Sequence, residues 1–100
     1  MGIEDWRNEI DVIDSKLLRL LNMRARIAIK VGVLKRTAGL PLNDAEREQE
    51  VLQRVRQANS GPLDDETVMR LFRSIIRESR RAQESAPEAN SQVCSREVQQ

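Results

Sequence analysis

The chain has 100 residues, of which 33% are charged, 39% are hydrophobic and 2% are aromatic, and its formal net charge at pH 7 is +1. This mixed charge and the scarcity of aromatic rings argue against nucleic-acid binding, which needs a basic face and often stacking side chains. Histidine is absent and the single cysteine, Cys94, lies in a polar segment, which all but excludes a zinc site, a disulfide, a cysteine nucleophile and a histidine general base.

The composition predicts one small all-α domain in residues 1–86. Leu, Ile, Arg and Glu are plentiful, only three prolines and four glycines interrupt the chain, and no repeat is present, a pattern typical of helical proteins. The first six residues, MGIEDW, resemble neither a secretory signal nor a myristoylation site. We therefore expect a cytoplasmic protein with no membrane partner.

The first predicted helix covers residues 5–38, with Asp5 as its N-cap and with Gly39 and Pro41 ending it. Residues 27–33 alternate like a half-buried strand when read alone. In a longer window, however, one apolar stripe recurs every three or four residues, through Trp6, Ile10, Ile13, Leu17, Leu20, Ile27, Val31 and Leu34. The longer window has more matches and predicts a helix.

This helix is too long for a monomer of this size. About 33 residues at ~1.5 Å each give about 50 Å, whereas a compact 100-residue domain has a radius of gyration of about 13 Å. The apolar stripe therefore predicts a homodimer with paired long helices. We expect Gly32, inside the stripe, to allow close packing against the partner chain.

Two shorter helices follow, over residues 44–58 and 65–85. Asn43 is expected to cap the first of them, with Glu46 completing a capping box, and Asp64 is expected to cap the second. Residues 87–100 lack an apolar period, and we expect them to form a disordered tail. The sequence thus predicts an all-α fold with three helices per chain, one long and two shorter, in a dimer with antiparallel or crossed long helices.

Several polar residues fall on the apolar faces of these helices. Their positions continue the apolar stripes and converge on one region: Arg24 and Lys35 in the first helix, Asp44, Arg47 and Glu48 in the second, and Ser79 and Gln83 in the third. The cations outnumber the carboxylates. Because burying an unpaired cation costs several kcal/mol, the pattern favours an anionic ligand such as a small polycarboxylate or a phosphate.

Arg7 is a further cation near the start of the stripe, but about 25 Å of helix separates it from Arg24. Only a crossed or antiparallel dimer brings both arginines to one small ligand. Simpler interpretations stay open for the other residues. Arg24 could extend along the apolar stripe to reach solvent. Lys35 could be a solvated cation at the C-terminus of its helix, and Asp44 could be favoured by the helix dipole.

The chain resembles the all-helical (AroQ-type) chorismate mutases over roughly residues 3–85. The resemblance rests on WRNEIDVIDSKLLRLLNMRARIAIKVGVLK, on LPLNDAEREQEVL and on LFRSIIRESRRAQ. Each segment is weakly specific alone, but their order and spacing together are specific. They also contain the polar residues picked out above.

The resemblance implies rearrangement of chorismate to prephenate, the branch point toward phenylalanine and tyrosine, with no cofactor and no metal. It implies an intertwined helical homodimer in which Arg7 of the partner subunit, with Arg24 and Arg47, binds the substrate carboxylates, assisted by Ser79. Lys35 and Gln83 would bind the ether oxygen, while Glu48 and the backbone near Asp44 would hold the ring hydroxyl.

Two other functions remain in view. One is an isochorismate pyruvate lyase of the same fold, against which Glu48 argues because such a lyase is expected to lack a carboxylate at that position. The other is a non-catalytic helical dimerisation module, in which the polar residues on the apolar faces set the register of helix pairing. The second alternative leaves the convergence of Arg24, Lys35, Glu48 and Gln83 as coincidence.

Overall fold

The chain folds into three α-helices in the computed structural model, which describes residues 1–85. They are α1 (Ile3–Thr37), α2 (Ala45–Ala58) and α3 (Asp65–Ser85), and no strand occurs within this part of the chain. The all-α class and the order of one long helix and two shorter ones are confirmed. The tail predicted over residues 87–100 lies outside the described residues.

The helix caps differ from the sequence prediction at two of the three N-termini. Asp5 is not the N-cap of α1: it lies in the first turn, where its Oδ2 accepts a hydrogen bond from the Gly2 N–H at 2.9 Å. Asp44, not Asn43, caps α2 by accepting from the Arg47 N–H at 3.0 Å. A carboxylate suits both positions because it meets free N–H groups at the positive end of the helix dipole.

The cap of α3 agrees with the prediction, since Asp64 Oδ1 accepts from the Thr67 N–H at 2.8 Å. At the other end of α1, Gly39 adopts φ of 74°. That left-handed conformation suits glycine, and it turns the chain out of the helix.

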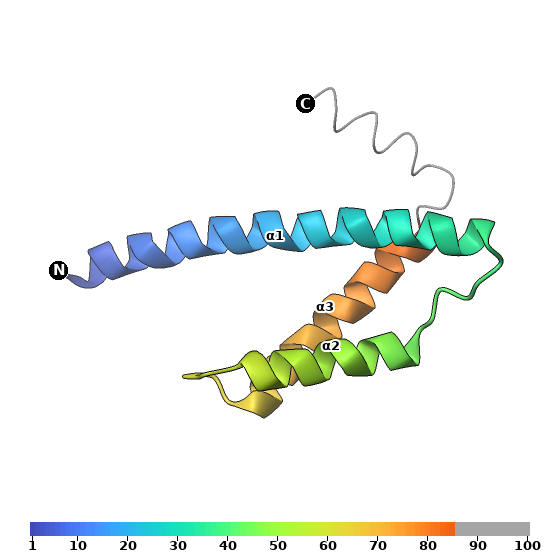
Figure 1. Ribbon diagram of the computed structural model, residues 1–100. Helices are drawn as coiled ribbons and strands as arrows, with labels where there is room; N and C mark the ends of the chain where they lie inside the picture. The colour runs from blue at the N-terminus through green and yellow to red at the C-terminus, as the bar shows by residue number, and fades with distance from the viewer. Residues whose placement is uncertain (86–100) are drawn as a thin grey trace, which may run out of the picture.

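Helix α3 joins the other two helices, as Figure 1 shows. It crosses diagonally from the far end of α2 to the C-terminal part of α1 and packs against both. The N-terminal part of α1 extends beyond the other helices, and residues 1–23 are all exposed. The radius of gyration is 16.6 Å, larger than the ~13 Å of a compact domain of this length.

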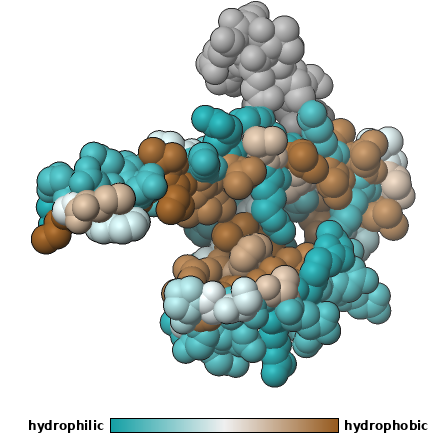
Figure 2. Space-filling model, turned by 60° about the vertical axis from the view of Figure 1, so that its left-hand side comes forward, coloured by the Kyte–Doolittle hydropathy of each residue, from teal (hydrophilic) through white to brown (hydrophobic). Residues whose placement is uncertain are grey.

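The apolar stripe of α1 is largely uncovered in the single chain. Trp6, Ile13 and Leu20 are 56%, 59% and 60% exposed, whereas Leu52, at 2%, is the one buried hydrophobic residue among those described. Figure 2 shows hydrophobic residues along α1 and on both sides of the hollow that separates it from the other helices. No helix within residues 1–85 is long and apolar enough to cross a bilayer.

Gly32 makes its close approach within the chain, which corrects the expectation that it packs against a partner chain. A Cβ built at Gly32 would lie 3.2 Å from Gln83 Cγ and 3.3 Å from Gln83 Cβ. Gly32 is buried where α3 reaches α1, so the missing side chain lets the two helices of one chain meet closely.

Candidate functional site

A cavity of about 290 Å³ lies between the three helices. Ile27, Val31, Val51 and Ile76 supply part of its apolar lining. Seven of the eight residues predicted from the sequence also line it: Arg24, Lys35, Asp44, Arg47, Glu48, Ser79 and Gln83. The three apolar faces therefore converge on one polar cavity.

Arg24 and Ser79 join α1 to α3 at the cavity wall. Arg24 Nη1 donates a hydrogen bond to Ser79 Oγ at 2.7 Å, and Ser79 is only 8% exposed. The contact places the guanidinium at the cavity wall, so the Arg24 side chain does not simply extend along the apolar stripe into solvent. A guanidinium has five N–H donors, which leaves others to bind an anion.

Lys35 and Asp44 meet on another side of the cavity, between the last turn of α1 and the N-cap of α2. Lys35 Nζ lies 3.7 Å from Asp44 Oδ2, and the lysine side chain is 21% exposed. Asp44 also caps α2. The carboxylate thus holds Lys35 at the cavity edge, while the ammonium keeps further protons for a ligand.

Within residues 1–85, Gln83 supplies the one amide side chain of the cavity lining and is 9% exposed. Its Nε2 donates to the backbone oxygen of Ala28 at 2.8 Å, and its methylenes occupy the space beside Gly32 where a larger residue would place its Cβ. A primary amide nitrogen carries two protons. The bond to Ala28 uses one and fixes the direction of the other.

Arg80 is a cavity residue that the sequence analysis missed. It forms an ion pair with Glu48 of α2, and both residues line the cavity. The signal was present in the spacing, because Arg80 lies four residues after Ile76 and so continues the apolar stripe of α3.

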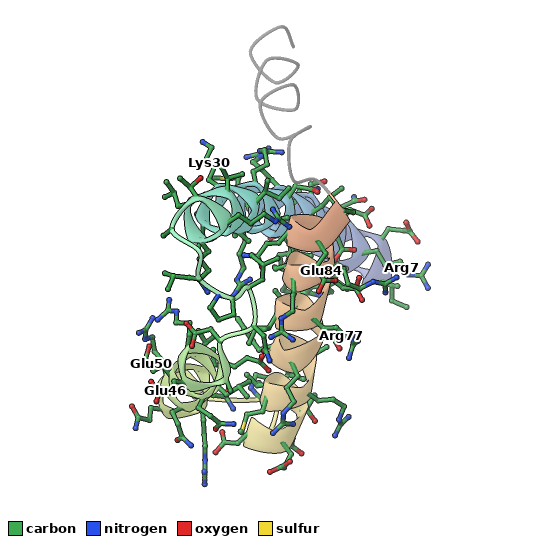
Figure 3. The ribbon with its side chains drawn as sticks, turned by 90° about the vertical axis from the view of Figure 1, so that its right-hand side faces the viewer. Arg7, Lys30, Glu46, Glu50, Arg77 and Glu84 are labelled. Atoms are coloured by element: carbon green, nitrogen blue, oxygen red, sulfur yellow. The ribbon has the colours of Figure 1, made fainter. Side chains whose placement is uncertain are left out.

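Two of the predicted arginines pair with glutamates outside the cavity in the single chain. Arg47 lines the cavity, but its Nη1 lies 3.2 Å from Glu50 Oε1, and Glu50 projects from the outer side of α2 (Figure 3). Arg7 is not at the cavity: it pairs with Glu4 at 2.9 Å near the free end of α1 and points away from the other helices (Figure 3).

The charge of the cavity favours an anion. Its lining contains the four cations Arg24, Lys35, Arg47 and Arg80 and the two carboxylates Asp44 and Glu48, a formal excess of two positive charges. Such a lining, with two neutral hydrogen-bonding side chains, suits a small dianion. Among residues 1–85 no group of three or more His, Cys, Asp or Glu side chains is arranged to hold a metal ion.

Comparison with known proteins adds independent information. The family model for chorismate mutase type II matches residues 6–84. The bifunctional chorismate mutase/prephenate dehydratase of Neisseria gonorrhoeae is 50% identical over 72 residues, which cover 72% of this chain and 19% of that protein. The chain thus spans about a fifth of the length of the first curated relatives it matches.

Solved structures match over most of both chains. Chorismate mutase from Thermus thermophilus (form II) has a TM-score of 0.83 and 36% identity, covering 86% of this chain and 98% of that one. Chorismate mutase from Helicobacter pylori in complex with prephenate has a TM-score of 0.78 and 34% identity, covering 84% and 91%. With the family match over residues 6–84, these similarities establish that the chain belongs to the type II chorismate mutases.

Proposed function

We propose that this protein catalyses the rearrangement of chorismate to prephenate. The observation that carries the proposal is the cavity in which Arg24, Lys35 and Gln83 converge within a cationic lining. Its formal excess of two positive charges matches a substrate with two carboxylates. Membership of the family and the similarity to an enzyme solved with prephenate support the same reaction.

The first task of the site is to hold a flexible dianion in its compact reactive shape. Arg24, fixed by its hydrogen bond to Ser79, is placed to bind one carboxylate. Arg47 binds another part of the substrate after its guanidinium leaves Glu50, an exchange that costs little because the Arg47–Glu50 pair is more than half exposed. Holding the two reacting ends together supplies orientation, which is a large part of catalysis for an intramolecular reaction.

The second task is to stabilise the charge that develops on the ether oxygen as the C–O bond breaks. Lys35 supplies a cationic donor, and the second Nε2 proton of Gln83 supplies a neutral one. Donors fixed before the reaction need no reorganisation when the charge appears. A pericyclic rearrangement transfers no proton to the protein, so these groups are sufficient without histidine, a metal or a cofactor.

The ring hydroxyl is assigned to Glu48 and to the backbone near Asp44. Glu48 is already paired with Arg80, but a carboxylate has about four acceptor positions. It therefore accepts from a hydroxyl while keeping the arginine. This pairing also cancels a negative charge that would otherwise repel the dianion.

The functional unit is proposed to be a homodimer. The uncovered stripe that includes Trp6, Ile13 and Leu20 runs along about 35 Å of helix over residues 1–23, a surface that a second copy would cover. Crossed pairing of two α1 helices would bring Arg7 of the partner subunit to the cavity. Arg7 stands about 25 Å from Arg24 along its own helix and cannot serve the same site.

The direct test incubates the purified protein with chorismate and identifies the product. We expect prephenate, and we expect Arg24→Ala to reduce kcat/KM by at least about 100-fold because it removes a charge-assisted bond to the substrate. Arg77→Ala is the matched control, since Arg77 is exposed on the outer side of α3 (Figure 3). Isochorismate is assayed in parallel.

The outcomes separate the candidate functions. Prephenate from the wild type and the control, with its loss in Arg24→Ala, supports the mutase and the assigned cavity. Pyruvate release from isochorismate without prephenate formation would replace the proposal with a lyase. No turnover of either substrate by a folded dimer would favour the dimerisation module.

A further inference from the structure

We infer that one strip of α1, formed by Ala28, Gly32 and Arg36, holds Gln83 in its working position. The three residues are spaced by four, so they lie on one face of the helix. Each contacts a different part of Gln83: the side-chain amide, the side-chain methylenes and the backbone carbonyl. Gly32 and Arg36 are thus positioning residues for the neutral donor of the cavity.

Gly32 supplies the space. A Cβ at this position would lie 3.2 Å from Gln83 Cγ, 3.3 Å from its Cβ and 3.6 Å from its Cδ. The first two distances are closer than ordinary van der Waals contact, so alanine would push the glutamine side chain outward by a few tenths of an ångström. Glycine costs helix stability relative to alanine, and the approach of Gln83 gives a reason for glycine here.

Ala28 supplies the acceptor. Its backbone oxygen receives Gln83 Nε2 at 2.8 Å, and in an α-helix the same oxygen accepts from the N–H of residue 32. The close approach over Gly32 and the hydrogen bond to Ala28 therefore depend on each other. Moving the Gln83 methylenes away from Gly32 would lengthen the hydrogen bond from Nε2 to the Ala28 oxygen. That bond sets the direction of the second Nε2 proton.

Arg36 anchors the backbone. Its Nη2 donates to the Gln83 carbonyl oxygen at 2.8 Å in a partly buried contact. A charge-assisted bond to a main-chain atom fixes the position of α3 along α1 independently of the glutamine side chain. With Gly32 and Ala28 it makes a three-point support for one residue.

The inference rests on the proposed function only for what Gln83 does with its second proton. The support itself is tested by the side-chain amide signals of Gln83 in ¹⁵N–¹H spectra, assigned by their loss in Gln83→Ala. We expect them to shift in Gly32→Ala and in Arg36→Met. They should stay unchanged in Lys30→Met, which removes one positive charge from an exposed position of α1 on the side away from α3 (Figure 3).

Kinetics provide the second measurement. We expect Gly32→Ala to lower kcat with chorismate by about 3- to 10-fold, as a displacement of a few tenths of an ångström implies, with KM nearly unchanged. The melting temperature should stay equal or rise, because alanine favours the helix. In the Gln83→Ala background, adding Gly32→Ala should no longer change kcat.

Each result bears on one proposal. Unchanged Gln83 signals in both Gly32→Ala and Arg36→Met would overturn the three-point support, whether or not prephenate forms. A loss of kcat that persists at full size in the Gln83→Ala background would show that Gly32 acts by another route. Shifted signals in a protein that makes no prephenate would uphold the support and reject the proposed function alone.

Discussion

Arg80 of α3 and Glu48 of α2 form an ion pair at the wall of the cavity, with side chains 29% and 30% exposed. The pair ties together two helices that each contribute site residues. It also neutralises one of the two carboxylates in the cavity. The excess of positive charge that suits a dianion therefore depends on a residue outside the set that the sequence analysis identified.

Replacing Arg80 by methionine tests this role. Arg80→Met keeps much of the side-chain length but removes the charge and leaves Glu48 without its partner. We expect KM for chorismate to rise about 10-fold, at the low end for a charge-assisted contact because the pair is partly exposed, with a smaller change in kcat. Arg77→Met removes an exposed charge from the same helix (Figure 3) and should leave KM unchanged; equal effects of the two substitutions would contradict the assignment.

A second prediction concerns Gln83 and pH. The wild-type amide does not titrate, so activity should stay flat from mild acid to neutrality. In Gln83→Glu a carboxyl group replaces the amide beside the Ala28 carbonyl, and enclosure and the facing oxygen favour its neutral form. Its pKa should therefore lie above that of an ordinary glutamate, and activity should fall as the pH rises through it.

The Gln83→Glu variant also tests the number of donors. A protonated carboxyl group has one O–H, whereas the amide has two N–H groups. It cannot bind both Ala28 and the ether oxygen, so we expect activity below that of the wild type even in acid. Profiles of kcat against pH for both proteins, with folding followed by circular dichroism, supply the measurement. Parallel profiles would rule out this use of Gln83.

The three helices could be read from the sequence because their apolar residues repeat at helical spacing over long windows. The polar cavity residues could be found because Arg24, Ser79 and Gln83 occupy positions that continue those stripes. Arg80 also continues its stripe, but α3 contains several other arginines, and spacing alone does not distinguish a cavity arginine from a surface one. Spacing gives the face of a helix, but it does not say which neighbouring helix supplies a partner such as Glu48.

Gly32 illustrates the same limit. The sequence indicates a close approach at this glycine, but the choice between a partner chain and α3 depends on how α3 crosses α1. That crossing is set by tertiary contacts, including the bond from Arg36 to Gln83. The N-caps differ for a local reason: adjacent acceptors such as Asn43 and Asp44 can each cap a helix, and the backbone geometry of the turn selects one.

The proposed homodimer leads to a complementation prediction. Arg7→Ala and Arg24→Ala should each lose most activity, one through the residue lent to the partner and the other through its own cavity. Mixed and allowed to exchange, they form hybrid dimers with one intact site and one doubly altered site. Random exchange should restore about a quarter of wild-type activity. Mixing Arg24→Ala with Gln83→Ala is the control, because both act in their own cavity and no intact site arises.

Two results would contradict crossed sites. One is full activity of Arg7→Ala, which would show that this arginine serves no site. The other is an inactive mixture whose hybrid dimers are verified by mass spectrometry. That result would show that Arg7 and Arg24 both act in the cavity of their own chain. If a second copy covers the uncovered stripe of α1, as proposed, sedimentation of the wild type should give the mass of two chains.

The last prediction concerns stability and uses the cap of α3. Hydrogen bonds from the side chain and the backbone N–H of Thr67 hold the pKa of Asp64 below the 3.8 of an unperturbed aspartate. The ionised carboxylate is thus favoured in the folded state. Its contribution to stability is present above pH 3.8 and is lost as the pH falls through the lowered value.

Thermal unfolding of three variants separates the cap from its charge. Asp64→Ala removes both and should lower the melting temperature at pH 7 by about 4 °C, whereas Asp64→Asn keeps an acceptor and should lose less. The difference between the wild type and Asp64→Asn should shrink as the carboxylate becomes protonated in acid. Glu66→Ala is the control, because it removes a charge from the first turn of α3 that makes no cap, and it should lower the melting temperature less. Equal losses in Asp64→Ala and Glu66→Ala would show that Asp64 acts only through its interaction with the helix dipole.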